Sequence, residues 1–334
     1  MKVSVIVPVR DEEHSIRELL DSLLQQTRQP DEIVITDGGS VDATPQIIEQ
    51  YIQQGAPLRL LRAGPALPGR GRNLGAAAAQ FEWLAFTDAG IRLDRDWLEN
   101  LIARAERDET IAIVYGAWEP VTDSFFKQCA AIAYVAAPVT MSDGVVARPP
   151  SITSALVRRE AWAAVGGFPE DLRSAEDLLF MNRLEDAGYR AVVEPRAQVH
   201  WNLKPTLGST FKRFLIYSRS NIRAGLWRQW QAAILSRYAL LFVVLVFALI
   251  LDPSWVWLPF ATWSLMLSAR ALVSIGRNRD RYPASFLQNL RRGFVIVALL
   301  ALLDAAAIIG SLQWLLLDAF RPGRKRAVEA GNGV

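Results

Sequence analysis

The chain has 334 residues, of which 51% are apolar and 21% are charged. A formal net charge of only +3 gives no reason to expect a nucleic-acid partner. Cys129 is the single cysteine, which excludes a disulfide framework within the chain and a Cys-x-x-Cys metal site.

The apolar residues are distributed unevenly. The first 230 residues have the composition of a soluble enzyme, whereas long apolar runs begin at about Tyr238. The apolar stretch near the N-terminus ends after a few residues in Pro8 and charged residues, so it is too short for the core of a signal peptide. We therefore expect the first domain to stay in the cytoplasm.

Strand and helix patterns alternate along the first part of the chain. Short runs rich in Val and Ile predict strands, and they are separated by segments with helical spacing of apolar residues. The expected strands are 3–9, 32–36, 58–62 and 83–87, and the expected helices are 11–26, 43–54 and 72–80, followed by strands 111–115 and 191–194 and a helix at 177–187. This alternation predicts an α/β fold, with a mostly parallel sheet covered by helices on both faces. Ligands of such sheets bind beyond the carboxyl ends of the strands.

The last third of the chain predicts a membrane region. Residues 211–235 form a basic, aromatic segment typical of an amphipathic helix on an anionic membrane surface; a solvated helix is the alternative. Residues 236–320 contain a predicted hairpin of two spans, 238–273, and a third span, 294–317.

Charge sets an expected orientation for these spans. The Arg-rich segment between the second and third spans is expected on the cytoplasmic side, like the basic segment before the first. The tail, 321–334, is also basic, which conflicts with an odd number of crossings, so two to four spans remain open. Asp304 is an acid within the third span and therefore a candidate functional residue, with a helix break as the alternative.

Six segments occur in an order that resembles the family 2 glycosyltransferases of GT-A fold. They are VSVIVPVRDEEHSIRELLDSLLQQT, DEIVITDGGSVDAT, GRGRNLGAA, FTDAG followed by DRDWLE, VRREAWAAVGGFPEDL and AEDLLFMNRLEDAGYR. The resemblance covers roughly residues 1 to 225. It implies a GT-A (Rossmann-like) nucleotide-sugar transferase domain at 1–210, held by the C-terminal transmembrane helices at the inner membrane of a bacterium.

The strand-end acids are candidate donor contacts. A carboxylate after the second strand can accept a hydrogen bond from a nucleotide base, and Asp37 is placed for that contact. Asp11 follows the first strand and is a candidate for base or ribose. Asp42 is expected instead to cap the following helix.

Two arginines follow the Gly-rich loop. The planar guanidinium suits phosphate, so Arg70 and Arg72 are candidate donor-binding residues. The resemblance assigns nucleotide contact to Arg72, the Arg of an RN-x-G segment; a surface Arg that caps a carbonyl is the alternative.

A divalent cation, Mn²⁺ or Mg²⁺, is the cofactor that the resemblance implies. Family members carry Asp-x-Asp after the fourth strand, whereas this chain has Asp88-Ala89-Gly90. Asp88 is the candidate metal ligand, with phosphate oxygens and water completing the shell. His200 is a second candidate ligand, and a hydrogen-bonded structural His is its alternative.

The resemblance places the catalytic acids at the Glu176-Asp177 pair. Asp177 is the expected general base and Glu176 its neighbour or an acceptor contact. The alternative is a doublet that stabilises a helix N-terminus.

Three functions remain open from the sequence. The first is an inverting transferase of hexosyl or related groups, acting on the hydroxyl of a lipid-linked or membrane-associated acceptor. The second is a transferase that charges polyprenyl phosphate, an acceptor that needs no base. The third is a non-catalytic membrane protein that binds nucleotide-sugar.

Overall fold

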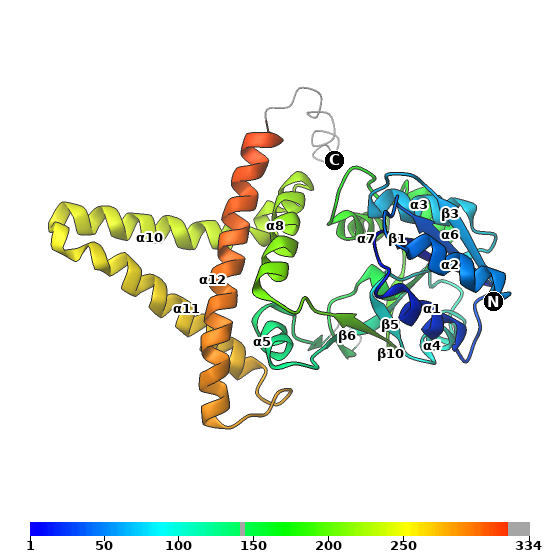
Figure 1. The fold of residues 1–334 in the computed structure, drawn as a ribbon, viewed down its shortest axis with the longest axis horizontal. Helices are drawn as coiled ribbons and strands as arrows, with labels where there is room; N and C mark the ends of the chain where they lie inside the picture. Colours follow the sequence, from blue (N-terminus) through cyan, green and yellow to red (C-terminus); the bar gives the residue numbers. More distant parts are fainter. Residues whose placement is uncertain (141–143, 320–334) are drawn as a thin grey trace. The chain divides into compact units, whose positions relative to one another are not determined.

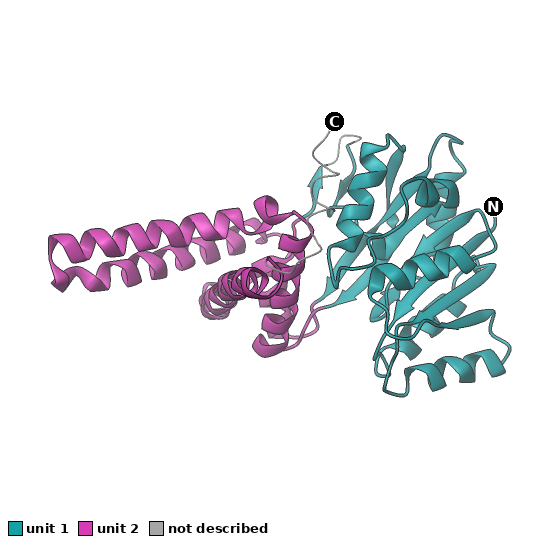
Figure 2. Ribbon diagram, turned by 90° about the horizontal axis from the view of Figure 1, so that it is seen from above, with its two compact units in different colours: residues 1–121, 138–202 teal, residues 122–137, 203–334 magenta. Residues whose placement is uncertain are grey.

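The computed structural model describes residues 1–140 and 144–319. The chain forms two compact units (Figure 2). Residues 1–121 and 138–202 form one, here called the sheet unit, and residues 122–137 and 203–334 form the other, the helical unit. The predicted basic tail, 321–334, lies outside the described residues.

The sheet unit is built on a mixed sheet of eight strands in the order β3-β2-β1-β4-β9-β6-β10-β5 (Figure 1). Strands β3, β2, β1 and β4 are parallel, β9 is antiparallel to both neighbours, β10 is parallel to β6, and β5 is antiparallel to β10. The bounds are β1 Val3–Val9, β2 Glu32–Asp37, β3 Leu58–Arg62, β4 Trp83–Phe86, β5 Ile91–Leu93, β6 Ile113–Val121, β9 Ala155–Arg158 and β10 Ala191–Asn202, with a separate pair β7 Val139–Thr140 and β8 Val146–Ala147. The predicted α/β class is confirmed.

Helices cover both faces of this sheet, as predicted. They are α1 Ile16–Leu24, α2 Thr44–Gln53, α3 Pro68–Ala78, α4 Trp97–Ala105, α6 Arg159–Ala164 and α7 Glu176–Asp186, with a 3-10 turn at Ile152–Ser154. Alternate residues of β1 point to opposite faces. Val5 and Val7 join one apolar core with α1, α2 and α4, whereas Ile6 joins the other with Phe168 and Phe180.

The starts of two helices in the sheet unit differ from the prediction by about one turn. The helix expected from residue 11 begins at Ile16, and Asp11, with a φ of 55°, is part of the loop before it. The helix expected from Arg72 begins one turn earlier, at Pro68, whose fixed φ suits the first turn of a helix. Gly69 and Gly71 therefore belong to α3.

The helical unit contains α5 Phe125–Tyr134, α8 Leu207–Arg223, α9 Trp227–Trp230, α10 Ala232–Leu251, a 3-10 turn at Pro253–Trp257, α11 Leu258–Arg277 and α12 Phe286–Leu317. Three segments, Ala232–Leu251, Pro253–Arg277 and Phe286–Leu317, are long and apolar enough to cross a membrane. The third helix begins earlier than predicted, because Ser285 and Gln288 form a capping box at its N-terminus. The predicted interfacial segment, 211–235, is divided between α8, α9 and the start of α10.

Candidate active site

Three parallel strands bring three of the predicted acids to one edge of the sheet. β1 pairs with β2 on one side and β4 on the other, with Val9 opposite Asp37 and Ile6 opposite Phe86. Asp37 is the last residue of β2, and Asp11 and Asp88 each follow their strand by two residues. The carboxyl ends of these strands therefore form the rim at which the acids gather.

Ser40 links Asp11 to Asp37. Its hydroxyl donates to Asp37 Oδ1 over 2.6 Å and accepts from the backbone N–H of Asp11 over 2.9 Å. Asp11 Oδ1 in turn accepts from the backbone N–H of Val41 over 2.9 Å. The loops after β1 and β2 are thus joined through their acids.

Asp42 lies beside these loops and takes a structural role. Its carboxylate accepts from the backbone and the hydroxyl of Thr44, the first residue of α2, and from the backbone N–H of Glu13. These bonds hold the pKa of Asp42 below its ordinary value. Asp42 was predicted to cap α2, but the N-cap residue is Ala43, and Asp42 instead binds the first residue of the helix from one position earlier.

Arg72 is the centre of the site. Its side chain is 4% exposed, and its guanidinium donates to Asp88 Oδ1 over 2.6 Å and to Glu176 Oε1 over 2.7 Å. Arg72 thereby joins α3 to the loop after β4 and to the first residue of α7. The face of Phe168 lies 5.3 Å from its guanidinium carbon.

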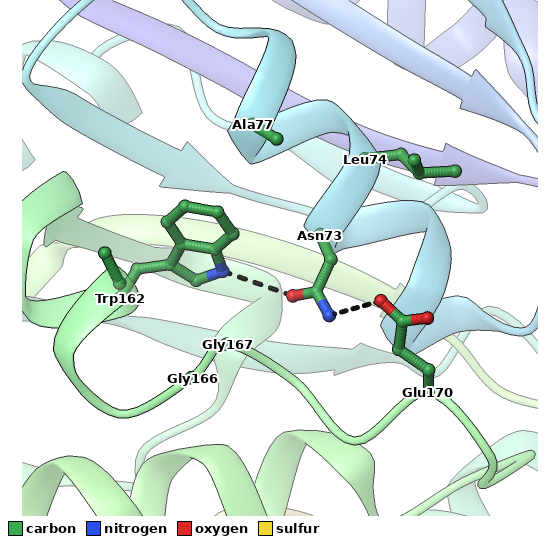
Figure 3. A pocket seen from close by; sticks show the side chains of 8 residues that line it. Asn73, Leu74, Ala77, Trp162, Gly166, Gly167 and Glu170 are labelled. Carbon is green, nitrogen blue, oxygen red and sulfur yellow. Dashed lines mark hydrogen bonds between the residues drawn. The ribbon is translucent and has the colours of Figure 1, made fainter.

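The neighbours of Arg72 in the RN-x-G segment serve the packing of α3. A Cβ at Gly75 would lie 2.7 Å from Ile6 Cγ2, so only glycine lets α3 approach β1 so closely. Asn73 fastens the loop after α6: its amide group donates to the carbonyl of Phe168 and to Glu170 and accepts from the Phe168 N–H and the Trp162 indole. Figure 3 shows Asn73 between Trp162 and Glu170, where these residues line a surface pocket of about 420 Å³.

The sequence analysis did not single out Asn73. Its signal was adjacency to Arg72 within the same motif, but its partners lie 89 to 97 residues further along the chain. Asn73 thereby holds the loop that leads to Glu176, one of the two hydrogen-bond partners of Arg72.

Arg70 lies apart from this cluster. Residues two apart on a helix point in different directions, so Arg72 is buried while Arg70 is exposed and lines a second surface pocket with Arg62 and Leu74. The structure does not bring together the two arginines that the sequence grouped.

Three carboxylates share the charge of Arg72. Asp177 follows Glu176 on α7, and its carboxylate interacts electrostatically with both Arg72 and Asp88. Burial raises the pKa of Asp177 and of Glu176, an effect that Arg72 opposes in both and that neighbouring carboxylate charge reinforces. Arg72 therefore serves three carboxylates at once.

The backbone before this acid pair is strained. Ala175, the residue before α7, has a φ of 71°, in the left-handed region that side chains with a Cβ rarely adopt. Such strain persists where the surrounding structure over-determines a conformation, as it does at many functional sites.

The family described as "Glycosyl transferase family group 2" matches residues 85–309, two thirds of the chain, and "Glycosyl transferase family 2" matches residues 4–131. The chain belongs to glycosyl transferase family 2. It therefore carries the transferase domain of that family.

Curated relatives of this family share parts of the chain. The glycosyltransferase EpsJ of Bacillus subtilis is 27% identical over 53% of this chain and 54% of its own. The poly(ribitol-phosphate) beta-N-acetylglucosaminyltransferase TarS of Staphylococcus aureus is 30% identical over 54% of this chain and 32% of its own. The pre-mycofactocin glycosyltransferase of Mycobacterium tuberculosis is 26% identical over 65% of this chain and 46% of its own. The matches thus span roughly a third to a half of the length of these relatives.

A solved structure shares the fold. The mannosyltransferase PcManGT of Pyrobaculum calidifontis, solved with GDP-Man and Mn²⁺, has a TM-score of 0.54 and 21% identity, covering 94% of this chain and 87% of its own. This likeness agrees with the predicted GT-A fold.

The metal ligands that the family implies fit this chain in part. Asp88 is 30% exposed at the rim, so its carboxylate suits one position on a divalent cation whose other ligands are phosphate and water. His200 instead lies 2.8 Å from Asp94 through its Nε2. Among residues 1–140 and 144–319, no group of three His, Cys, Asp or Glu side chains is arranged to hold a metal ion.

Proposed function

We propose that this family 2 protein is an inverting glycosyltransferase that moves a sugar from a nucleotide-sugar to a hydroxyl of a membrane-associated acceptor. One observation carries the proposal: Arg72 binds Asp88 and Glu176 together at the rim, beside Asp177. A donor-side acid and the predicted acceptor-side base thereby share one positively charged partner.

The donor is proposed to bind at the rim formed by the first two strands. Asp37 is 4% exposed, and Ser40 donates a hydrogen bond to its carboxylate. A nucleotide base would therefore contact Asp37 at the border of the loop after β2, with Asp11 next to it. PcManGT was solved with GDP-Man, and TarS is named for transfer of N-acetylglucosamine, which supports a nucleotide-sugar as donor.

Asp177 is proposed as the general base. It would take the proton of the acceptor hydroxyl as that oxygen forms a bond to the anomeric carbon. The bond from this carbon to the diphosphate breaks with its electron pair, and a nucleoside diphosphate leaves. Attack opposite the leaving group inverts the sugar, so an α-linked donor yields a β product. The raised pKa of Asp177 favours this role, because a stronger base accepts the proton more readily.

Asp88 is proposed to hold a divalent cation on the diphosphate. A bound cation would neutralise the charge that develops on the leaving group. On the protein side, Arg72 fixes Asp88 from within the fold and leaves its carboxylate partly open to solvent.

The acceptor is proposed to be lipid-linked or itself a lipid, with the transferase domain on the cytoplasmic side of the inner membrane. The three apolar helices support this proposal, because they would hold the chain at a bilayer. An acceptor delivered within that bilayer would meet the domain at a high local concentration.

A screen of purified full-length protein tests the proposal. Nucleotide-sugars are tested for thermal stabilisation and turnover with and without Mn²⁺, in membranes that supply lipid acceptors. The turnover of Asp177→Asn should be lower by about 10²-fold or more, the loss expected when a general base is removed. The donor should still stabilise this variant against thermal unfolding. Asp186→Asn, an exposed acid at the other end of α7, is the matched control.

Two results would contradict this assignment. Full turnover by Asp177→Asn would indicate an acceptor that is already an anion, such as polyprenyl phosphate. Donor binding without turnover by the unmodified protein on any acceptor fraction would indicate a binding protein.

A further inference from the structure

The third apolar helix, α12, runs crosswise to the first two. In Figure 1, α10 and α11 form a long hairpin, and α12 passes across the base of this hairpin with α8 at its side. The hairpin leaves α12 on the side away from α8. Three membrane spans would run roughly parallel or antiparallel to one another, whereas α12 runs across the direction of the hairpin.

The hairpin has the surface of a membrane-inserted element. Only 6% of the most apolar part of α10 is buried within the protein, so its apolar residues are exposed all round. Its 20 residues extend about 30 Å, the thickness of the hydrocarbon layer. Trp230 lies at one end, and Trp255 and Trp257 at the other, as expected for rings at the two headgroup regions.

The helix α12 is attached along its length to α5 and to the basic helix α8. Arg292 donates to Gln128 of α5, the carbonyl of Ala307 accepts from Ser218 of α8, and Asp318 pairs with Arg219 of α8 over 2.7 Å. Asp318 follows Arg292 by 26 positions, which corresponds to about 39 Å along a helix and exceeds the hydrocarbon thickness of about 30 Å.

The partner helix α8 cannot enter the bilayer with α12. It carries Lys212, Arg213, Arg219 and Arg223 and no acid of its own, and Arg219 is paired with Asp318. Charged side chains are costly in the hydrocarbon layer, so a helix of this composition belongs at the membrane surface. The two helices cannot separate without loss of close packing, since a Cβ at Gly310 would lie 2.7 Å from Ser218 Cβ.

The remaining face of α12 is a continuous apolar stripe. Residues spaced by three or four positions follow it from end to end: Phe286, Leu290, Phe294, Ala298, Ala301, Ala305, Ile309, Leu312 and Leu316. Phe294 is 72% exposed and Leu316 is 75% exposed, while the opposite face is buried at Arg292, Ile296 and Leu299. One apolar side and one protein-covered side are typical of a helix that lies in a membrane surface.

We infer that α12 lies along the membrane surface as a lateral support, and that only the α10–α11 hairpin enters the bilayer. The surface that it contacts is a bilayer with anionic headgroups. Six Lys or Arg residues and no acid occur in 207–237, and five Arg and one Asp occur in 277–292. Two crossings return the chain to the same side, so both basic segments face the same anionic leaflet.

Single-cysteine labelling tests this arrangement in the full chain. The buried Cys129 is replaced by Ala, and one cysteine is introduced at Pro283 before α12 or at Ala319 after it. Gln54→Cys, in the sheet unit, marks the side of the transferase domain. In sealed proteoliposomes that contain phosphatidylglycerol, a membrane-impermeant maleimide should label all three positions from the same side, and Ser254→Cys at the hairpin tip from the other side or not at all.

A depth measurement provides a second, independent readout. Spin labels at Leu290, Phe294, Ile309, Leu312 and Leu316 should report one shallow depth along α12. A depth profile that is greatest in the middle of the helix, or labelling of Pro283→Cys and Ala319→Cys from opposite sides, would overturn the inference. Turnover is not part of either readout, so this result is separate from the fate of the proposed function.

Discussion

Arg72 donates to Asp88 over 2.6 Å although the two residues belong to different elements, a helix and the loop after a strand. The same guanidinium reaches Glu176, 104 residues further along the chain. The site therefore depends on a buried cation whose partners come from three separate segments.

Substitution of Arg72 should damage both activity and folding. Arg72→Lys keeps one charge but lacks the planar fork that reaches two carboxylates, so turnover should fall by at least ~10²-fold, the loss expected when reacting groups are misplaced. Arg72→Ala leaves three acids without a cation and should lower the unfolding free energy by about 3–5 kcal/mol. Chemical denaturation and turnover measure both effects.

Arg70→Ala is the matched control on the same helix. Because Arg70 is exposed, its removal should change the unfolding free energy by no more than about 0.5 kcal/mol. Equal damage from both substitutions would contradict a special position for Arg72.

Asp177 should impose a pH dependence on activity. A general base must be ionised, so turnover should rise with pH through the pKa of Asp177, which burial raises above the ordinary value of 3.8. Asp177→Asn should lose this rise, and Asp186→Asn should keep it. An unchanged pH profile in Asp177→Asn would exclude the base assignment.

The same raised pKa predicts that the contribution of Asp177 to stability falls with rising pH, whereas its contribution to activity rises. A group whose pKa is raised in the folded state stabilises the fold most when it is protonated, and its contribution is lost as pH rises through that pKa. Asp177→Asn should therefore melt at a higher temperature than the unmodified protein at pH 8, and the difference should shrink at lower pH. Thermal unfolding at both pH values is the measurement, and a lower melting temperature at pH 8 would contradict the expectation.

Glycine at position 175 should stabilise the protein. Ala175→Gly removes the cost of a Cβ at a φ of 71° and should raise the unfolding free energy by about 1 kcal/mol. The matched control is Ala187→Gly, where the φ is −77° and glycine brings no relief of strain. A loss of stability in Ala175→Gly would show that the alanine is not strained.

Asp304 should be essential to the helical unit. Its carboxylate is 1% exposed and lies 2.6 Å from Arg270 and 3.5 Å from Arg237. Asp304→Leu would therefore remove the shared carboxylate partner of these two arginines. We expect a loss of about 3–5 kcal/mol in detergent, measured by unfolding. Asp252→Asn, at the exposed hairpin tip, should have little effect; comparable losses in the two variants would argue against a structural ion pair at Asp304.

The dependence of activity on Mn²⁺ should distinguish Asp88 from His200, the two predicted metal ligands. EDTA should abolish turnover and Mn²⁺ should restore it, and Asp88→Asn should raise the Mn²⁺ concentration for half-maximal activity by tenfold or more, about 1.4 kcal/mol of binding free energy. His200→Ala should leave this concentration unchanged, because His200 is paired with Asp94. An equal shift in both variants would place His200 at the metal.

Local patterns in the sequence determined much of the fold and the rim. Alternating apolar runs predicted parallel strands, and the acids at or just after the ends of β1, β2 and β4 met at one edge, since parallel strands share the direction of their carboxyl ends. The three apolar segments were equally visible, because hydropathy is a property of neighbouring residues.

The tertiary structure alone decided which side chains meet and which way the helices run. The partners of Arg72 and Asn73, and the separation of Arg70 from Arg72, depend on the packing of α3 against segments about 100 residues away. The composition of α12 is that of a membrane span, yet its polar attachments to α5 and α8 set its direction. Hydropathy shows that a helix is apolar enough for a membrane, whereas packing against neighbouring helices determines which of its faces stays exposed.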